Sequence, residues 1–143
     1  MMRLLQTLAF AFLCIALPGA AADARLVLVA STQSPIVRIS VEEERNLYLG
    51  IPILVGGQPV QPVRNITDPV TEEMFLQKIM FMSSQAYERQ ILSRVFRSGG
   101  NPPLVVTNKS DLINALLADR MAVTYMLRET AVAIRGIRIV TEP

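Results

Sequence analysis

The sequence predicts an α/β protein with a mixed, mainly parallel sheet and helices on both faces of that sheet. Two observations lead to this fold class. Short apolar runs typical of strands alternate with segments that carry helix-start signals, and 143 residues suffice for one domain with a core but not for two ordinary domains. Alternating strands and helices generally form a sheet that is buried on both faces. No internal repeat or linker divides the chain.

The first 22 residues are expected to form a secretory signal peptide. Arg3 gives a positive start, residues 4–17 are an apolar run of 14 residues, and the small residues 20–22 follow. Cleavage is expected before Asp23, with cleavage after Ala24 as the alternative. The processed protein is therefore expected in the periplasm.

The predicted mature chain, residues 23–143, is expected to form a single domain without a membrane span. The apolar run of the signal has 14 residues, whereas a spanning helix needs about 20. Cys14 follows Leu13, where a lipoprotein processing site would need a small residue, so a lipid anchor is not expected either.

Composition excludes several classes of function. Cys14 is the single cysteine and there is no histidine, so Ser-His-Asp and Cys-His catalysis are excluded, and a metal site would have to rely on carboxylates alone. Adjacent acids such as Glu72 and Glu73 point in different directions on a helix and form no acid–base pair. We expect no enzyme and no cofactor. Of the 14 Lys and Arg residues Arg3 lies in the signal, which leaves 13 against 12 acidic residues and no electrostatic footprint for nucleic acid.

The first strand and helix of the domain are predicted from a buried run and a capping box. Residues 25–30 (RLVLVA) suit a strand that is buried on both faces. Ser40 and Glu43 fit the capping-box pattern of a helix that ends at Gly50. The acids at residues 42–44 match the helix dipole and are expected to be solvated.

The middle of the domain is predicted to contain two short extended segments and a buried helix. Residues 53–55 and 59–63 flank a Gly-Gly turn. Asp68 and the following proline predict a helix start, and this helix is expected to run to about Met82. Its body, MFLQKIMFM, is apolar almost all round, which favours burial; a docking face is the alternative.

The chain from residue 83 onwards is predicted to contain three further helices and three strands. Ser83 or Ser84 starts a helix that ends near Ser98, and its arginines at 89, 94 and 97 lie outside the apolar stripe, as expected of a solvated face. The remaining elements are a strand at 104–107, a helix capped by Asn108 and running to about 118, a strand at 121–126, a short helix within 128–135 and a strand at 137–140.

Several of these segments, in order, resemble one lobe of the phosphate-type periplasmic substrate-binding proteins of ABC transporters. The segments that carry the resemblance are VLVASTQSPIVRIS, VEEERNLYLG, GGQPVQPVRN and NPPLVVTNKSDLINALLADRMAVTYM. The resemblance extends over nearly all of residues 25–140. The resemblance implies one lobe of a type 2 periplasmic-binding-protein fold, where the full fold has two lobes that close on a ligand.

The resemblance also implies a ligand-binding site at the start of the second predicted helix. The family's phosphate loop reads Arg, three residues, then Ser-Gly-Thr at a helix N-terminus; here Arg64 is kept and residues 68–70 read Asp-Pro-Val. Thr67 and Thr71 could supply hydroxyls from shifted positions, so the implied ligand-binding residues are Arg64, Thr67, Asp68 and Thr71. Because Asp68 adds a negative charge, an Arg64–Asp68 pair could instead fill the anion site internally.

Two functions follow from the resemblance. In the first, the chain is a periplasmic substrate-binding-like protein related to phosphate ABC transporter binding components, and it binds a small oxyanion such as phosphate weakly, as a homodimer or with a protein partner. In the alternative, it is a non-ligand-binding envelope interaction protein that reuses the fold to dock a sensor or a transporter component.

Overall fold

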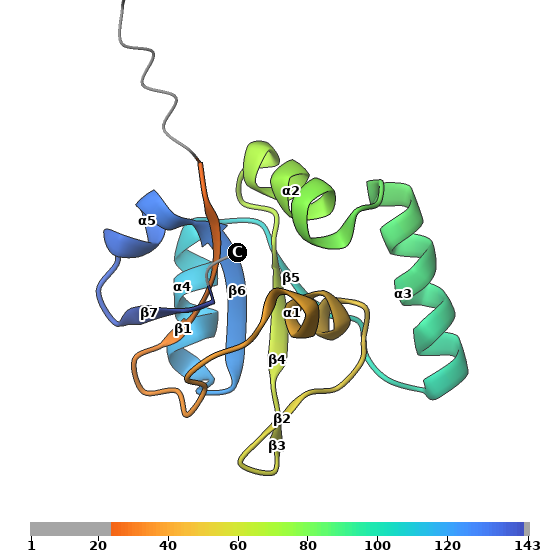
Figure 1. Ribbon diagram of the computed structural model, residues 1–143, viewed down its shortest axis with the longest axis horizontal. Coiled ribbons are helices and arrows are strands. Elements are labelled where there is room, and N and C mark those ends of the chain that lie inside the picture. Colours follow the sequence, from red (N-terminus) through yellow and green to blue (C-terminus); the bar gives the residue numbers. More distant parts are fainter. Residues whose placement is uncertain (1–23, 142–143) are drawn as a thin grey trace, which may run out of the picture.

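The computed structural model describes residues 24–141 of the protein (Figure 1). The predicted signal peptide, residues 1–22, lies outside the described residues and stays a prediction. The elements in chain order are β1 (Leu26–Ser31), α1 (Val41–Tyr48), β2 (Leu54–Val55), β3 (Gln58–Pro59), β4 (Gln61–Asn65), α2 (Pro69–Phe75), η1 (Leu76–Met80), α3 (Ser84–Ser98), β5 (Leu104–Val106), α4 (Lys109–Ala118), β6 (Ala122–Leu127), α5 (Arg128–Val132) and β7 (Ile137–Thr141). None of these helices is long and apolar enough to cross a membrane.

Five of the strands form one mixed sheet in the order β5-β4-β6-β1-β7, and β2 and β3 form a separate hairpin. β4 pairs in parallel with both β5 and β6, whereas β1 pairs antiparallel with β6 and β7. Four strands therefore point in one direction and only β1 runs against them. This confirms the predicted mixed, mainly parallel sheet.

Helices cover both faces of the sheet (Figure 1). One apolar cluster joins the sheet to α1, α2, η1 and α3, and a second cluster joins its other face to α4 and α5. β1 supplies both clusters: Leu28 and Ala30 belong to the first, and Val27 and Val29 to the second. Side chains alternate between the faces of a strand, so a strand that is buried on both faces reads as a continuous apolar run.

The predicted helix starts are confirmed by their caps. The Ser40 hydroxyl accepts a hydrogen bond from the Glu43 amide, and the Glu43 carboxylate accepts one from the Ser40 amide, which completes a capping box. The side chains of Ser83 and Asn108 cap α3 and α4 by accepting a hydrogen bond from the amide three residues further on. One acid of the first α1 turn differs from expectation: Glu44 is only 1% exposed, because it points into the core rather than to solvent.

The second helix does not run to Met82 as a regular helix. α2 ends at Phe75 and continues as a π-helix, η1, which is closed by Phe81 in the left-handed conformation at φ 55°. No glycine is present at this end, so a bulky residue takes the conformation that glycine usually supplies. The Nε of Arg45 donates to the free carbonyl of Ile79 at 2.6 Å. The predicted burial of this helix body is confirmed for most of its apolar residues, while Phe81 is exposed.

Candidate functional site

The predicted site lies at the end of the sheet where the parallel strands finish. β4 ends at Asn65, Asp68 caps α2, and the first residue of α4, Lys109, lies nearby. A pocket of about 260 Å³ opens here, and its lining includes Asn65, Thr67, Asp68, Thr71 and Lys109. In α/β sheets, ligands commonly bind outside the carboxyl ends of the strands. The structure thus brings together three of the four predicted site residues.

The Asp68 carboxylate uses its hydrogen bonds to start α2. It accepts from the amides of Val70 at 3.2 Å and Thr71 at 3.3 Å, and from the Thr71 hydroxyl at 2.8 Å. The hydroxyl of Thr71, together with these amides, holds the pKa of Asp68 below its usual value. Asp68 is therefore ionised at neutral pH, and it occupies the helix-start donors that would otherwise face an anion.

The Thr67 hydroxyl is also bound within the chain. It donates to the Asn65 side-chain oxygen at 2.6 Å, and the Thr67 amide donates to the same oxygen at 3.1 Å. The Asn65 amide group in turn donates to the carbonyl of Tyr125 at 2.9 Å. A threonine hydroxyl has a single proton to donate. Both pocket threonines therefore donate their hydroxyl proton to side chains of the protein itself.

Arg64 lies on the opposite face of the sheet from this pocket. Its neighbours on β4, Val63 and Asn65, face the α4 side, and alternation along the strand turns Arg64 towards α3. The Arg64 guanidinium bonds Glu88 at 2.5 Å and Glu72 at 3.2 Å. It also lies 4.7 Å from the centre of the Tyr87 ring.

The internal ion pair that the sequence suggested is thus formed with different partners. Asp68 caps α2, and Glu72 and Glu88 pair with Arg64. Arg64 is 6% exposed, so its charge is held within the protein rather than presented to a ligand. The assignment of Arg64, Thr67, Asp68 and Thr71 to an oxyanion stays a prediction.

Sequence reasoning missed Lys109, which is the cation that lines the pocket. The sequence did contain a feature that points to Lys109, because this residue directly follows the predicted N-cap Asn108. Helices that follow parallel strands start at the same edge of a sheet, so the first residue of this helix lies at the same edge as the start of α2. Within residues 24–141 no group of His, Cys, Asp or Glu side chains is arranged to hold a metal ion.

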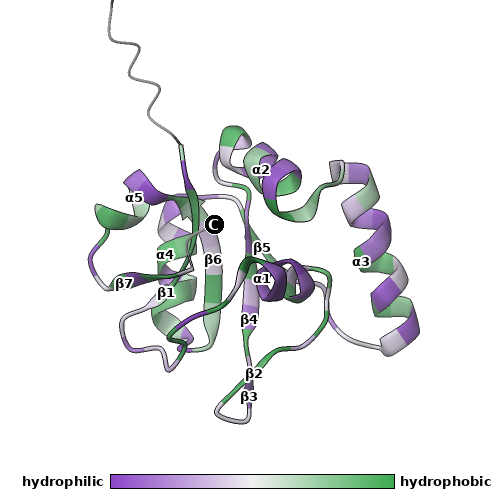
Figure 2. Ribbon diagram, viewed as in Figure 1, coloured by the Kyte–Doolittle hydropathy of each residue, from purple (hydrophilic) through white to green (hydrophobic). Residues whose placement is uncertain are grey.

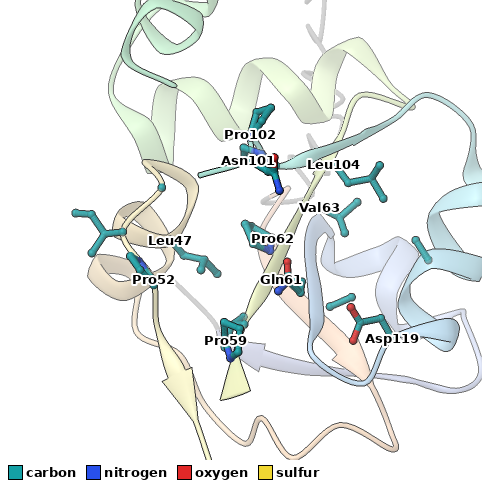
Figure 3. A pocket seen from close by; sticks show the side chains of 16 residues that line it. Leu47, Pro52, Pro59, Gln61, Pro62, Val63, Asn101, Pro102, Leu104 and Asp119 are labelled. Atoms are coloured by element: carbon teal, nitrogen blue, oxygen red, sulfur yellow. The ribbon is translucent and has the colours of Figure 1, made fainter. Parts of the chain in front are cut away.

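A larger pocket of about 490 Å³ lies at the other end of β4 (Figure 3). β5 pairs only with Val63 to Asn65, so the first residues of β4, Gln61 and Pro62, have no strand partner on that side. The lining is mostly apolar and rich in proline, and Asp119 is its one charged residue. Without a cation this pocket is unsuited to an oxyanion.

No protein-family model matches the chain, and no curated protein sequence does. Solved structures match its fold. An ABC-type phosphate transport receptor from Vibrio cholerae superposes with a TM-score of 0.59 at 14% identity, over 82% of this chain and 46% of that one. PstS from Borrelia burgdorferi gives a TM-score of 0.56 at 13% identity, over 82% and 47%. The fold is that of one lobe of a periplasmic binding protein.

A third structure with this periplasmic-binding fold was solved with bound phosphate. It is described as a phosphate ABC transporter substrate-binding protein from Clostridium perfringens, and it matches with a TM-score of 0.61 at 10% identity, over 82% of this chain and 44% of that one. The chain thus spans less than half the length of the structures that it matches. At these identities the likeness establishes the fold alone.

Proposed function

We propose that this chain is a periplasmic substrate-binding-like protein, related to the binding components of phosphate ABC transporters, that works as an interaction lobe. It retains the fold, holds an oxyanion such as phosphate weakly at most by itself, and docks on an envelope partner such as a sensor or a transporter component. The fold likeness and the predicted signal peptide support the periplasmic, non-enzymatic part of this proposal.

The observation that carries the docking role is the internal neutralisation of Arg64. Two carboxylates of the chain itself, Glu72 and Glu88, occupy its guanidinium, and Asp68 occupies the first amides of α2. Binding an anion with these groups would first require breaking those contacts, and a single lobe buries only part of a small ligand. Docking through the same end of the sheet requires no such rearrangement.

Weak oxyanion binding remains the second candidate, and Lys109 favours it. Lys109 and the hydroxyls of Thr67 and Thr71 line one pocket, beside the ionised Asp68. An ionised carboxylate can accept a hydrogen bond from an anion that still carries a proton. Phosphate carries one at neutral pH and sulfate does not, so this pocket would prefer phosphate.

Isothermal titration separates the two candidates. Residues 23–143 would be titrated with phosphate and sulfate, alongside Lys109→Gln and the control Arg135→Gln, an exposed arginine outside the pocket lining. The interaction role predicts no saturable heat at millimolar anion. Saturable phosphate heat that disappears in Lys109→Gln and persists in Arg135→Gln would establish the second candidate instead.

The docking face can be tested by photo-crosslinking in cells. A photoreactive residue at Val70, which is 61% exposed at the start of α2, is expected to give a discrete adduct. The matched control is Val37, which is 77% exposed in the loop after β1, at the other end of the sheet. Equal adducts from both positions, or none from Val70, would contradict docking through the α2 end.

A further inference from the structure

α3 is attached to the rest of the molecule by one face only. It is a 15-residue helix at the outer side of the helical layer (Figure 1). Tyr87 and Ile91 are its buried residues, and Val95 packs partly against the same cluster. These three positions recur every four residues and therefore mark one stripe of the helix. The opposite side of α3 has no covering element among the described residues.

The outer side of α3 carries two large apolar side chains. Phe96 is 89% exposed and Leu92 is 57% exposed. They lie four residues apart, so they form neighbouring points on the outer surface. Figure 2 shows strongly hydrophobic and strongly hydrophilic residues mixed along this helix. An aromatic ring this exposed is not explained by packing within the chain.

Three arginines of α3 line a hollow on the same helix, and none of them has a carboxylate partner within residues 24–141. Arg89, Arg94 and Arg97, with Ala86, Gln90 and Ser93, line a shallow hollow of about 430 Å³ that contains no acidic residue. The Ser93 hydroxyl accepts a hydrogen bond from Arg97 at 2.8 Å, which orients that guanidinium. The acid on α3, Glu88, is bonded to Arg64, and both ion pairs found in residues 24–141 belong to Arg64.

We propose that the outer face of α3 docks on an anionic lipid surface. Phe96 and Leu92 would enter the boundary between headgroups and acyl chains, while the arginines of the hollow bind headgroup phosphates. Charge complementarity selects an anionic partner, because three arginines and no acid line the hollow, and Glu88 on the same helix is already bonded to Arg64. The shallow hollow is too open to enclose a free ion. This contact would place the protein on a membrane without any spanning helix among residues 24–141.

A tryptophan reporter tests the depth of contact directly. The chain has no tryptophan, so Phe96→Trp in residues 23–143, which contain the whole described fold, introduces a single tryptophan that can be excited selectively. Its emission is expected to shift to the blue with vesicles of phosphatidylglycerol and phosphatidylcholine, but not with phosphatidylcholine alone. Val37→Trp, at a strongly exposed site on another part of the surface, is the matched control and should show no shift. Equal shifts at both sites, or no shift at position 96, would overturn the proposal.

Sedimentation with the same vesicles tests the charges. One arginine near an anionic membrane contributes about a fivefold gain in affinity, so Arg89→Gln with Arg97→Gln should weaken binding roughly 25-fold. Binding should also weaken as salt is raised. Arg135→Gln, an exposed arginine outside α3, should bind as the wild type does. An unchanged double variant, an equal loss in Arg135→Gln, or binding to polyglutamate without binding to vesicles would refute a lipid partner.

Discussion

Glu44 should make the stability of this protein fall as the pH rises towards neutrality. Its side chain is 1% exposed, and its Oε2 has no hydrogen-bond partner within the described residues. Desolvation raises the pKa of the Glu44 carboxyl from 4.5 to about 7. A carboxyl whose pKa is raised on folding binds a proton more readily in the native state than in the unfolded state.

The magnitude follows from the difference between the two pKa values. Below pH 4.5 the group is protonated in both states and imposes no penalty. Between pH 4.5 and about 7 the native state holds the proton that the unfolded state loses, so stability declines with pH. The interval of about 2.5 units, at 1.36 kcal/mol each, gives a loss of about 3 kcal/mol, which is complete above pH 7.

The assay is urea unfolding of the wild type and of Glu44→Gln at intervals from pH 4 to pH 8.5. The difference in unfolding free energy between them should change by about 3 kcal/mol in favour of the variant as the pH rises. Titration of the other carboxyls cancels in this difference. Glu42→Gln, a change of an exposed acid on the same helix, is the control and should give a flat difference. A flat difference for Glu44→Gln would refute the argument that this carboxyl is buried.

Three further variants test local features through urea unfolding at pH 7. Asp68→Ala removes the side-chain cap of α2 and should cost about 1 kcal/mol; an unchanged midpoint would mean that water replaces the cap. Tyr87→Phe removes the 2.7 Å hydrogen bond from the Tyr87 hydroxyl to the Tyr48 carbonyl and should lower the unfolding free energy by about 1–2 kcal/mol. An unchanged unfolding free energy would contradict a stabilising role of this bond between α3 and α1. Gly50→Ala places a Cβ 2.8 Å from an arginine side chain of α3, at a backbone φ of +87°. At Gly57 the φ is similar, +79°, but no atom lies within 4 Å of the added Cβ, so Gly50→Ala should destabilise the protein more than Gly57→Ala does. Equal losses of stability would show that backbone strain alone determines the effect of both substitutions.

The order of elements could be predicted because each one is encoded locally. The cap at Ser40 with Glu43, the Asp68-Pro69 start and the cap at Asn108 each specify a helix boundary through contacts within four residues. The position of β1 between β6 and β7 could not be predicted in this way. It depends on pairing between distant segments, and an apolar run such as residues 26–31 fits any central place in a sheet.

The site was predicted less completely for a similar reason. The capping role of Asp68 is local and was foreseen, whereas the pairing of Arg64 with Glu88 depends on how α3 packs, 24 residues further along the chain. Alternation on β4 determines which face Arg64 occupies, but it does not reveal which helix covers that face. The burial of Glu44 was missed because dipole matching accounts for an acid in the first turn without indicating the direction of its side chain.

The central place of β1 has a consequence for how the chain reaches its native state. β1 pairs along Leu26 to Ala30 with β6 and along Leu28 to Ser31 with β7, so both of its partners lie about 100 residues away. Such distant pairings slow folding, because a long loop must close before any contact stabilises it. A chain delivered with its N-terminus first would keep its most apolar strand unpaired until its last segments arrive. The antiparallel half of the sheet, β6-β1-β7, would therefore assemble late.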